Sequence, residues 1–130
     1  MEKRSIEEIE GDYWDEPTFH SYVVVASHKA RKRPLFELTA EDVRLLISQQ
    51  ISLDIVLPIA IDILSTNVGI DAYFYEGDLL NAVLRINDDY WNLYGELYAK
   101  VAELINNNIK LIRHNTNIDL MRINYFRQVK

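Results

Sequence analysis

The stretch that decides the fold is residues 52–66, which read SLDIVLPIAIDILST. Apolar side chains would cover most of the circumference of a helix over this stretch, so the pattern predicts a buried central helix. The exceptions, Asp54, Pro58 and Asp62, are spaced four residues apart and fall on one stripe of that helix. Pro58 lacks a backbone N–H and should bend the helix there. We interpret the stripe as the solvated edge of a core helix or as part of a binding surface.

Two more helices are predicted on the N-terminal side of this stretch. Residues 39–50 carry a helix start signal, because Thr39 can cap the helix while Asp42 completes a capping-box variant. Residues 21–33 are ambiguous, since three consecutive valines favour a strand by propensity. Their lack of alternation and their basic C-terminal end favour a helix instead, and Pro34 should end it.

On the C-terminal side, the sequence predicts a short helix over 79–86 and a long helix over 90–105. The acidic pair at 88–89 is expected to cap the long helix. Within residues 109–130, Ile118, Met121 and Tyr125 fit a helical face, but Leu120 to Val129 also fit an edge strand. We therefore expect an all-α fold, a single compact helical domain of about five helices with a C-terminal extension of uncertain structure.

Charge divides the chain near residue 105. The formal net charge is −6, but residues 1–105 hold 19 acids and 9 bases, whereas residues 106–130 hold 1 acid and 5 bases. This division predicts an acidic helical domain over 1–105 and a basic C-terminal extension over 106–130, docked on the domain because its apolar side chains need burial. An acidic body repels nucleic acid and attracts basic partners, although it also serves solubility alone.

The residue types narrow the chemistry. The chain has no cysteine, which removes disulfides, thiolate nucleophiles and cysteine-based zinc sites. His20, His28 and His114 lie far apart in the sequence and have no second ligand at the spacing of a zinc hydrolase. Neither a Gly-x-Ser-x-Gly elbow nor a phosphate-binding glycine loop occurs. We therefore expect no catalytic residue, no cofactor and no metal.

Hydropathy predicts no membrane association. Residues 1–8 carry no apolar run after their charges, so they do not resemble a secretory signal. The longest apolar stretch, residues 55–64, is interrupted by Pro58 and Asp62 and is shorter than the roughly 20 residues that span a bilayer. We expect a cytoplasmic protein that contacts neither membrane nor nucleic acid directly.

From Ser21 to about Ile105 the order of several motifs resembles the CdiI-like immunity proteins of contact-dependent growth inhibition (CDI) systems. Two departures stand out: Glu76 occupies a position where the family pattern leads us to expect proline, and the basic segment from Asn106 has no counterpart. The motifs that carry the resemblance are Ser21-Tyr22 with His28, Arg31 to Leu35, LTAEDVR at 38–44, ISLDIVLPIA at 51–60, FYEGDLLNAVLR at 74–85, and Trp91.

The resemblance implies an all-α fold and a specific function. Such proteins act in the cytoplasm, where they bind the C-terminal toxin domain that a neighbouring cell delivers. These toxins are often nucleases, and binding occludes the active site or the substrate surface. Such proteins are not enzymes. The alternatives are a helical scaffold or regulatory subunit without a toxin partner, and an enzyme with a cleft lined by Asp54, Asp62 and Asp78.

Aromatic residues beside acids are the best candidates for toxin binding. Aromatic anchors dominate the energy of many interfaces, and carboxylates would complement the basic groove of a nuclease. The competing interpretation is that Trp14, Tyr73 and Tyr75 are core residues. The predicted toxin-binding residues are Asp12, Tyr13, Trp14, Asp15 and Glu16, then Asp71, Tyr73, Tyr75 and Glu76, and the two acids of the central helix, Asp54 and Asp62.

Overall fold

A computed structural model describes residues 1–127 and confirms the predicted all-α fold. The number of helices differs from the expected five, because short helices add to the long ones. The nine described helices are α1 (Ile6–Glu10), α2 (Tyr22–Lys32), α3 (Ala40–Ser48), α4 (Leu53–Thr66), α5 (Asp78–Leu84), α6 (Asp88–Leu93), α7 (Gly95–Asn107), α8 (Ile109–His114) and α9 (Leu120–Arg127), and a 3₁₀ turn covers Leu35–Glu37.

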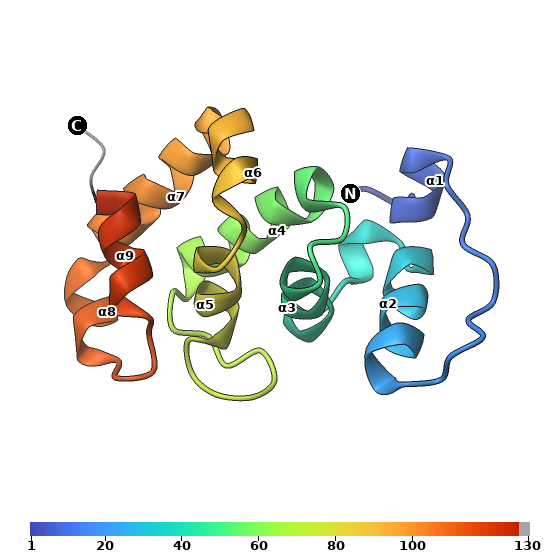
Figure 1. The fold of residues 1–130 in the computed structure, drawn as a ribbon, viewed down its shortest axis with the longest axis horizontal. Helices are drawn as coiled ribbons and strands as arrows, with labels where there is room; N and C mark the ends of the chain where they lie inside the picture. Colours follow the sequence, from blue (N-terminus) through green and yellow to red (C-terminus); the bar gives the residue numbers. More distant parts are fainter. Residues whose placement is uncertain (128–130) are drawn as a thin grey trace.

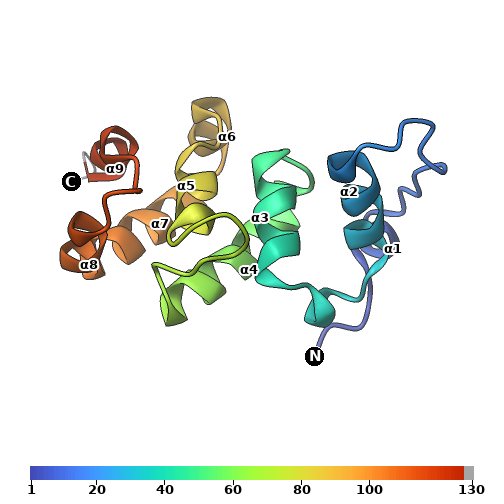
Figure 2. The same ribbon diagram turned by 90° about the horizontal axis from the view of Figure 1, so that it is seen from below.

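The helices follow one another along the long axis of the molecule (Figure 1). α1 and α2 form one end, α3, α4 and α5 form the middle, and α7 with α8 and α9 forms the other end (Figures 1 and 2). α3 connects α2 to α4 and α5, and α4 in turn packs on α7. The loop between α4 and α5 lies on the side that faces the viewer in Figure 2.

The central position of α4 confirms the prediction made from residues 52–66. Asp54, Pro58 and Asp62 are exposed on one stripe, while the opposite side of the helix packs in the core. The stripe is therefore in contact with solvent, and its part in binding stays a prediction. The buried side chains of α4 are Leu53, Val56, Leu57, Ala60 and Leu64.

The predicted helix starts at α2 and α3 are also confirmed. The Thr39 hydroxyl accepts a hydrogen bond from the Asp42 N–H at 3.1 Å, and the Asp42 carboxylate accepts one from the Thr39 N–H at 3.1 Å. Ser21 caps α2 by accepting from the Val24 N–H at 3.2 Å. Two reciprocal bonds satisfy N–H groups that a bare helix end would leave unpaired, so the position of α3 follows from local chemistry.

The single long helix predicted over 90–105 is wrong at its N-terminal end. α6 ends before Tyr94, whose φ and ψ of −120° and 62° are not helical, and α7 then begins at Gly95. The cap is Asn87, whose side chain accepts from the Asp89 N–H at 2.7 Å, rather than either acid of the predicted pair. The break at Tyr94 turns Trp91 into the core, 5.1 Å from the ring of Phe126.

Residues 109–114 and 120–127 are helical, so the edge strand considered for residues 120–129 is wrong over 120–127. α9 packs on α7, and buried apolar side chains from α8, the α8–α9 linker and α9 belong to the main core. Residues 128–130 lie outside the described residues. The division of the chain at residue 105 stays a prediction. The side chains that α8, the α8–α9 linker and α9 contribute to the core are Ile112, Ile118, Ile123 and Phe126.

Tyr90 on α6 gives a prediction about alkaline pH. Its hydroxyl is buried and bonds to no other described residue, and burial together with the nearby Asp54 carboxylate raises the Tyr90 pKa from 10.0 to about 12. The folded state therefore holds this proton more tightly than the unfolded state. Its contribution to stability is complete below pH 10 and is lost as the pH rises toward 12.

Tyr90→Phe should retain stability near neutral pH and lose less stability than the parent protein between about pH 8 and pH 11. Urea unfolding at both pH values measures this, and an equal loss in both proteins would contradict it.

Candidate partner-binding surface

Two sets of acids in this protein differ in whether a cation pairs with them. Within residues 1–127, seven acids form ion pairs with arginine or lysine, among them Asp42, Asp78 and Asp88. The acids predicted as toxin-binding are all exposed, and none of their carboxylates forms an ion pair with a basic side chain of residues 1–127. The one polar contact of this kind is made by a backbone atom, the Asp12 carbonyl, which accepts from Arg31. We call these seven the free acids: Asp12, Asp15, Glu16, Asp54, Asp62, Asp71 and Glu76. Their charges are available to a partner.

The first predicted set lies on the segment that leads from α1 to α2. Arg31, only 2% exposed, holds this segment, because Nη1 donates to Glu10 Oε1 at 2.8 Å and Nη2 donates to the Asp12 carbonyl. The guanidinium also stacks 4.2 Å from the centre of the Trp14 ring, which meets His28 edge-on at 5.0 Å. Trp14 is therefore half-buried against α2. Asp12, Tyr13, Asp15 and Glu16 remain exposed around it.

The second set lies on the loop between α4 and α5, which we call the 71–76 loop. The buried Asp78 carboxylate fixes this loop by accepting three backbone hydrogen bonds, from Ala72 at 2.8 Å and from Tyr73 and Phe74 at 3.0 and 2.8 Å. Asp78 is also the first residue of α5, so the start of this helix and the conformation of the preceding loop depend on one side chain.

The carboxylate cleft considered as an enzyme site is not formed. Asp78 is buried and its oxygens face backbone N–H groups, whereas Asp54 and Asp62 are exposed on α4. Across residues 1–127, no group of three or more His, Asp or Glu side chains is placed to hold a metal ion.

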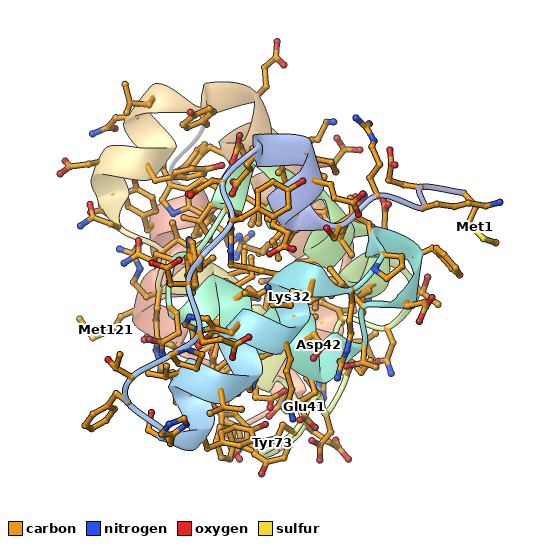
Figure 3. The ribbon with its side chains drawn as sticks, turned by 90° about the vertical axis from the view of Figure 1, so that its right-hand side faces the viewer. Met1, Lys32, Glu41, Asp42, Tyr73 and Met121 are labelled. Carbon is orange, nitrogen blue, oxygen red and sulfur yellow. The ribbon has the colours of Figure 1, made fainter. Side chains whose placement is uncertain are left out.

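Three exposed aromatic side chains meet where the 71–76 loop approaches the start of α2. Tyr73 stacks on Tyr22 with 6.0 Å between ring centres, and Phe74 meets Tyr73 edge-on at 4.7 Å. Tyr73 is 48% exposed, Tyr22 is 51% exposed and Phe74 is 64% exposed. We call these three residues the aromatic patch. The Tyr22 hydroxyl donates to Glu41 at 2.9 Å, which raises the Tyr22 pKa. Figure 3 shows Glu41 and Tyr73 together at one edge of the molecule.

Sequence reasoning found Tyr73 but missed its two neighbours. The sequence could have indicated Phe74 as a binding residue, because it lies between two aromatic residues of the predicted set. No sequence pattern indicates Tyr22, since only the packing of α2 beside the loop brings it to the aromatic patch. Tyr75, in contrast, is half-buried, and its hydroxyl accepts from Asn81 Nδ2 at 3.0 Å.

The segment between α8 and α9 supports the 71–76 loop from behind. Asn81, 1% exposed, donates to Tyr75 and to the Asn117 carbonyl at 2.8 Å, and so links the loop to this segment. Gly77 ends the loop with φ at +94°, and a Cβ there would lie 2.5 Å from the Ile118 side chain. The close approach requires glycine at this position. A groove of about 790 Å³ separates the loop from α8, and the free acids Asp71 and Glu76 line it.

An all-α fold with exposed aromatic side chains and free acids is typical of proteins that bind other proteins. A family model described as CDI immunity proteins matches residues 8–101, and the chain belongs to this family. The resemblance identified in the sequence is thereby confirmed, and the match extends further toward the N-terminus, while α8 and α9 lie beyond it. Searches of curated proteins and of solved structures each gave no significant match. None of the helices in residues 1–127 has the length and apolar character needed to cross a bilayer.

Proposed function

We propose that this protein binds the C-terminal toxin domain of a CDI effector in the cytoplasm and neutralises it by covering its active site or substrate surface. The observation that carries the proposal is the aromatic patch, three exposed rings of which two lie on a loop that the buried Asp78 carboxylate holds. Family membership supplies the biological setting. The protein acts stoichiometrically, and no catalytic step is required of it.

Pre-organisation of the patch supports this assignment. Aromatic side chains contribute most to an interface when they are already positioned, because ordering a loop on binding costs conformational entropy. Here the Asp78 carboxylate fixes the backbone of Tyr73 and Phe74, and Tyr22 is fixed by its bond to Glu41. The patch therefore meets the requirements for an energetic centre of an interface.

The free acids indicate the chemistry of the partner. Carboxylates without an internal cation favour a partner surface rich in lysine and arginine, and they raise the association rate. A nuclease holds its phosphate substrate with such basic side chains. We therefore propose a nuclease as the toxin, with the free acids of the 71–76 loop and of residues 12–16 facing its substrate groove. Asp54 and Asp62 are proposed as outer contacts.

The patch is tested by single alanine substitutions and the cognate toxin domain. Tyr73→Ala should weaken binding by about 2 kcal/mol or more, roughly thirty-fold, because a central aromatic anchor is lost. Tyr94→Ala is the matched control, since Tyr94 is 43% exposed and stacked on another tyrosine but lies between α6 and α7. Calorimetry with the toxin domain, followed by a growth assay in toxin-expressing cells, measures both. Equal affinities for the parent and for Tyr22→Ala, Tyr73→Ala and Phe74→Ala would rule out the aromatic patch.

The mechanism is tested separately with the toxin's own activity. If the partner is a nuclease, one equivalent of this protein should abolish cleavage, and Asp71→Asn with Glu76→Gln should slow association most at low salt. Stopped-flow mixing at two salt concentrations measures that effect. A complex in which the toxin keeps full activity would contradict neutralisation by occlusion.

A further inference from the structure

A buried arginine beside the aromatic patch has no side-chain hydrogen bond to any of residues 1–127. Arg44 on α3 is 8% exposed, and its guanidinium lies 4.7 Å from the centre of the Phe74 ring. Its side chain donates no hydrogen bond to any residue in the described part of the chain, and its Nε is completely buried. A guanidinium offers five N–H donors, and buried donors are almost always paired.

Asp78 balances the charge of Arg44 but not its hydrogen bonds. The nearest approach is 4.0 Å, from Arg44 Nε to Asp78 Oδ2, which exceeds hydrogen-bond distance. Both oxygens of Asp78 are already occupied by the backbone N–H groups of the 71–76 loop. Arg44 therefore keeps its fork of donors for another acceptor.

A cavity of about 310 Å³ opens beside Arg44, between α3 and α5, which Figure 1 shows side by side. Its polar lining comes from Ser48, Gln50, the exposed Arg85 and the buried Asp78, and Phe74 and Tyr75 of the 71–76 loop close one end. The cavity thus combines a cationic fork with walls that suit a short hydrocarbon stem. Its apolar lining comes mainly from Ile47, Phe74 and Ala82.

We propose that this cavity, here called the Arg44 pocket, receives the side-chain carboxylate of an aspartate or glutamate from the partner protein. The planar fork of a guanidinium matches the two oxygens of a carboxylate. The apolar walls would contact the methylene groups that carry it. Phe74 belongs both to the pocket and to the aromatic patch, so the two would be covered by the same partner. The inference rests on the proposed function for the identity of that partner.

The charges around the pocket favour a carboxylate over a phosphate. Asp78 places one negative charge within 4.0 Å of Arg44, and Arg85 is already paired with Asp119 at 3.5 Å. Because both arginines already have a counter-ion, the pocket holds no excess positive charge, and Asp78 repels a carboxylate with one charge less than a phosphate dianion. The pocket would also add specificity, because a toxin without an acidic side chain here would leave Arg44 unpaired in the interface.

The pocket is tested first with propionate as the probe, on the full chain and at constant ionic strength. Titration should shift the backbone amide NMR signals of Ser48 and Phe74 along a saturable curve. Ala82→Leu fills the pocket without changing a charge and should abolish the saturable shifts, while Ala99→Leu, on the exposed face of α7, should retain them. Shifts that are absent in the parent, or equal in all three proteins, would overturn the proposal. Saturable shifts with inorganic phosphate at lower concentration than with propionate would overturn the choice of a carboxylate.

The cognate toxin domain gives the second test. Ala82→Leu and Arg44→Lys should each weaken its binding by about ten-fold or more, because leucine fills the pocket and lysine lacks the planar fork that pairs with both carboxylate oxygens. Arg44→Lys keeps the positive charge beside Asp78, so circular dichroism should show an unchanged fold. A toxin complex that forms with unchanged affinity in both variants would overturn this inference alone. Failure of the parent protein to bind its toxin would overturn the proposed function, while the propionate titration would still decide the chemistry of the pocket.

Discussion

Asp78→Ala is expected to lower the free energy of unfolding by about 3–5 kcal/mol, the range found when one partner of a buried charge pair is removed. The substitution would leave three backbone N–H groups of the 71–76 loop without an acceptor. It would also leave Arg44 as a buried charge without its counter-ion. The loop should lose its fixed conformation, and the aromatic patch would lose its pre-organisation with it.

Urea unfolding, followed by circular dichroism, measures the effect of Asp78→Ala. Asp89→Ala is the matched control, because Asp89 is also a first-turn acid of a short helix but is exposed. The control should change stability by no more than about 0.5 kcal/mol. A similar small change for Asp78→Ala would show that its three hydrogen bonds do not hold the loop.

Arg31→Ala is expected to lower the free energy of unfolding by about 2–4 kcal/mol, since Arg31 is almost fully buried and its partner Glu10 is partly exposed. Its guanidinium is the point where α1, the following segment and α2 meet. The stacking of Arg31 on Trp14 would be lost as well, which removes a further contribution of about 0.5–2 kcal/mol within that range.

Lys32→Ala is the control for Arg31→Ala, because the two residues are adjacent on α2 and each pairs with an acid of α1. The Lys32 side chain is 48% exposed, so its pair with Glu7 should contribute less than about 1 kcal/mol. Limited proteolysis of the 11–20 segment gives a second readout, and it should be faster for Arg31→Ala only. Equal stability and equal proteolysis of the two variants would contradict the role assigned to Arg31.

Local signals explain why so much of the fold could be predicted. The capping box at Thr39 and the apolar circumference of residues 52–66 depend on neighbours within one or two helical turns, and both are confirmed. The break at Tyr94 was missed because the apolar period continues through it, while the cost of the break is offset by the burial of Trp91 at the other side of the core.

The site was harder to predict, because its supporting residues are distant in the sequence. Arg31 looked like a cation at a helix end, yet it is buried under a segment that precedes it by about twenty residues. Arg44 looked like part of a family motif and Asn81 like a polar position of a short helix. Their roles depend on which loop each helix meets, and no spacing within the helix encodes that.

The separation between paired and free acids has a consequence for how this protein can be altered. Carboxylates such as Asp78 and Asp42 form ion pairs within the fold, and substituting them would lower the stability of the folded protein. The side chains of the seven free acids form no ion pair within residues 1–127, so a randomised library at those positions should remain largely well folded. Selection from such a library could give a protein that binds an unrelated toxin while its helices and its ion-paired acids remain unchanged.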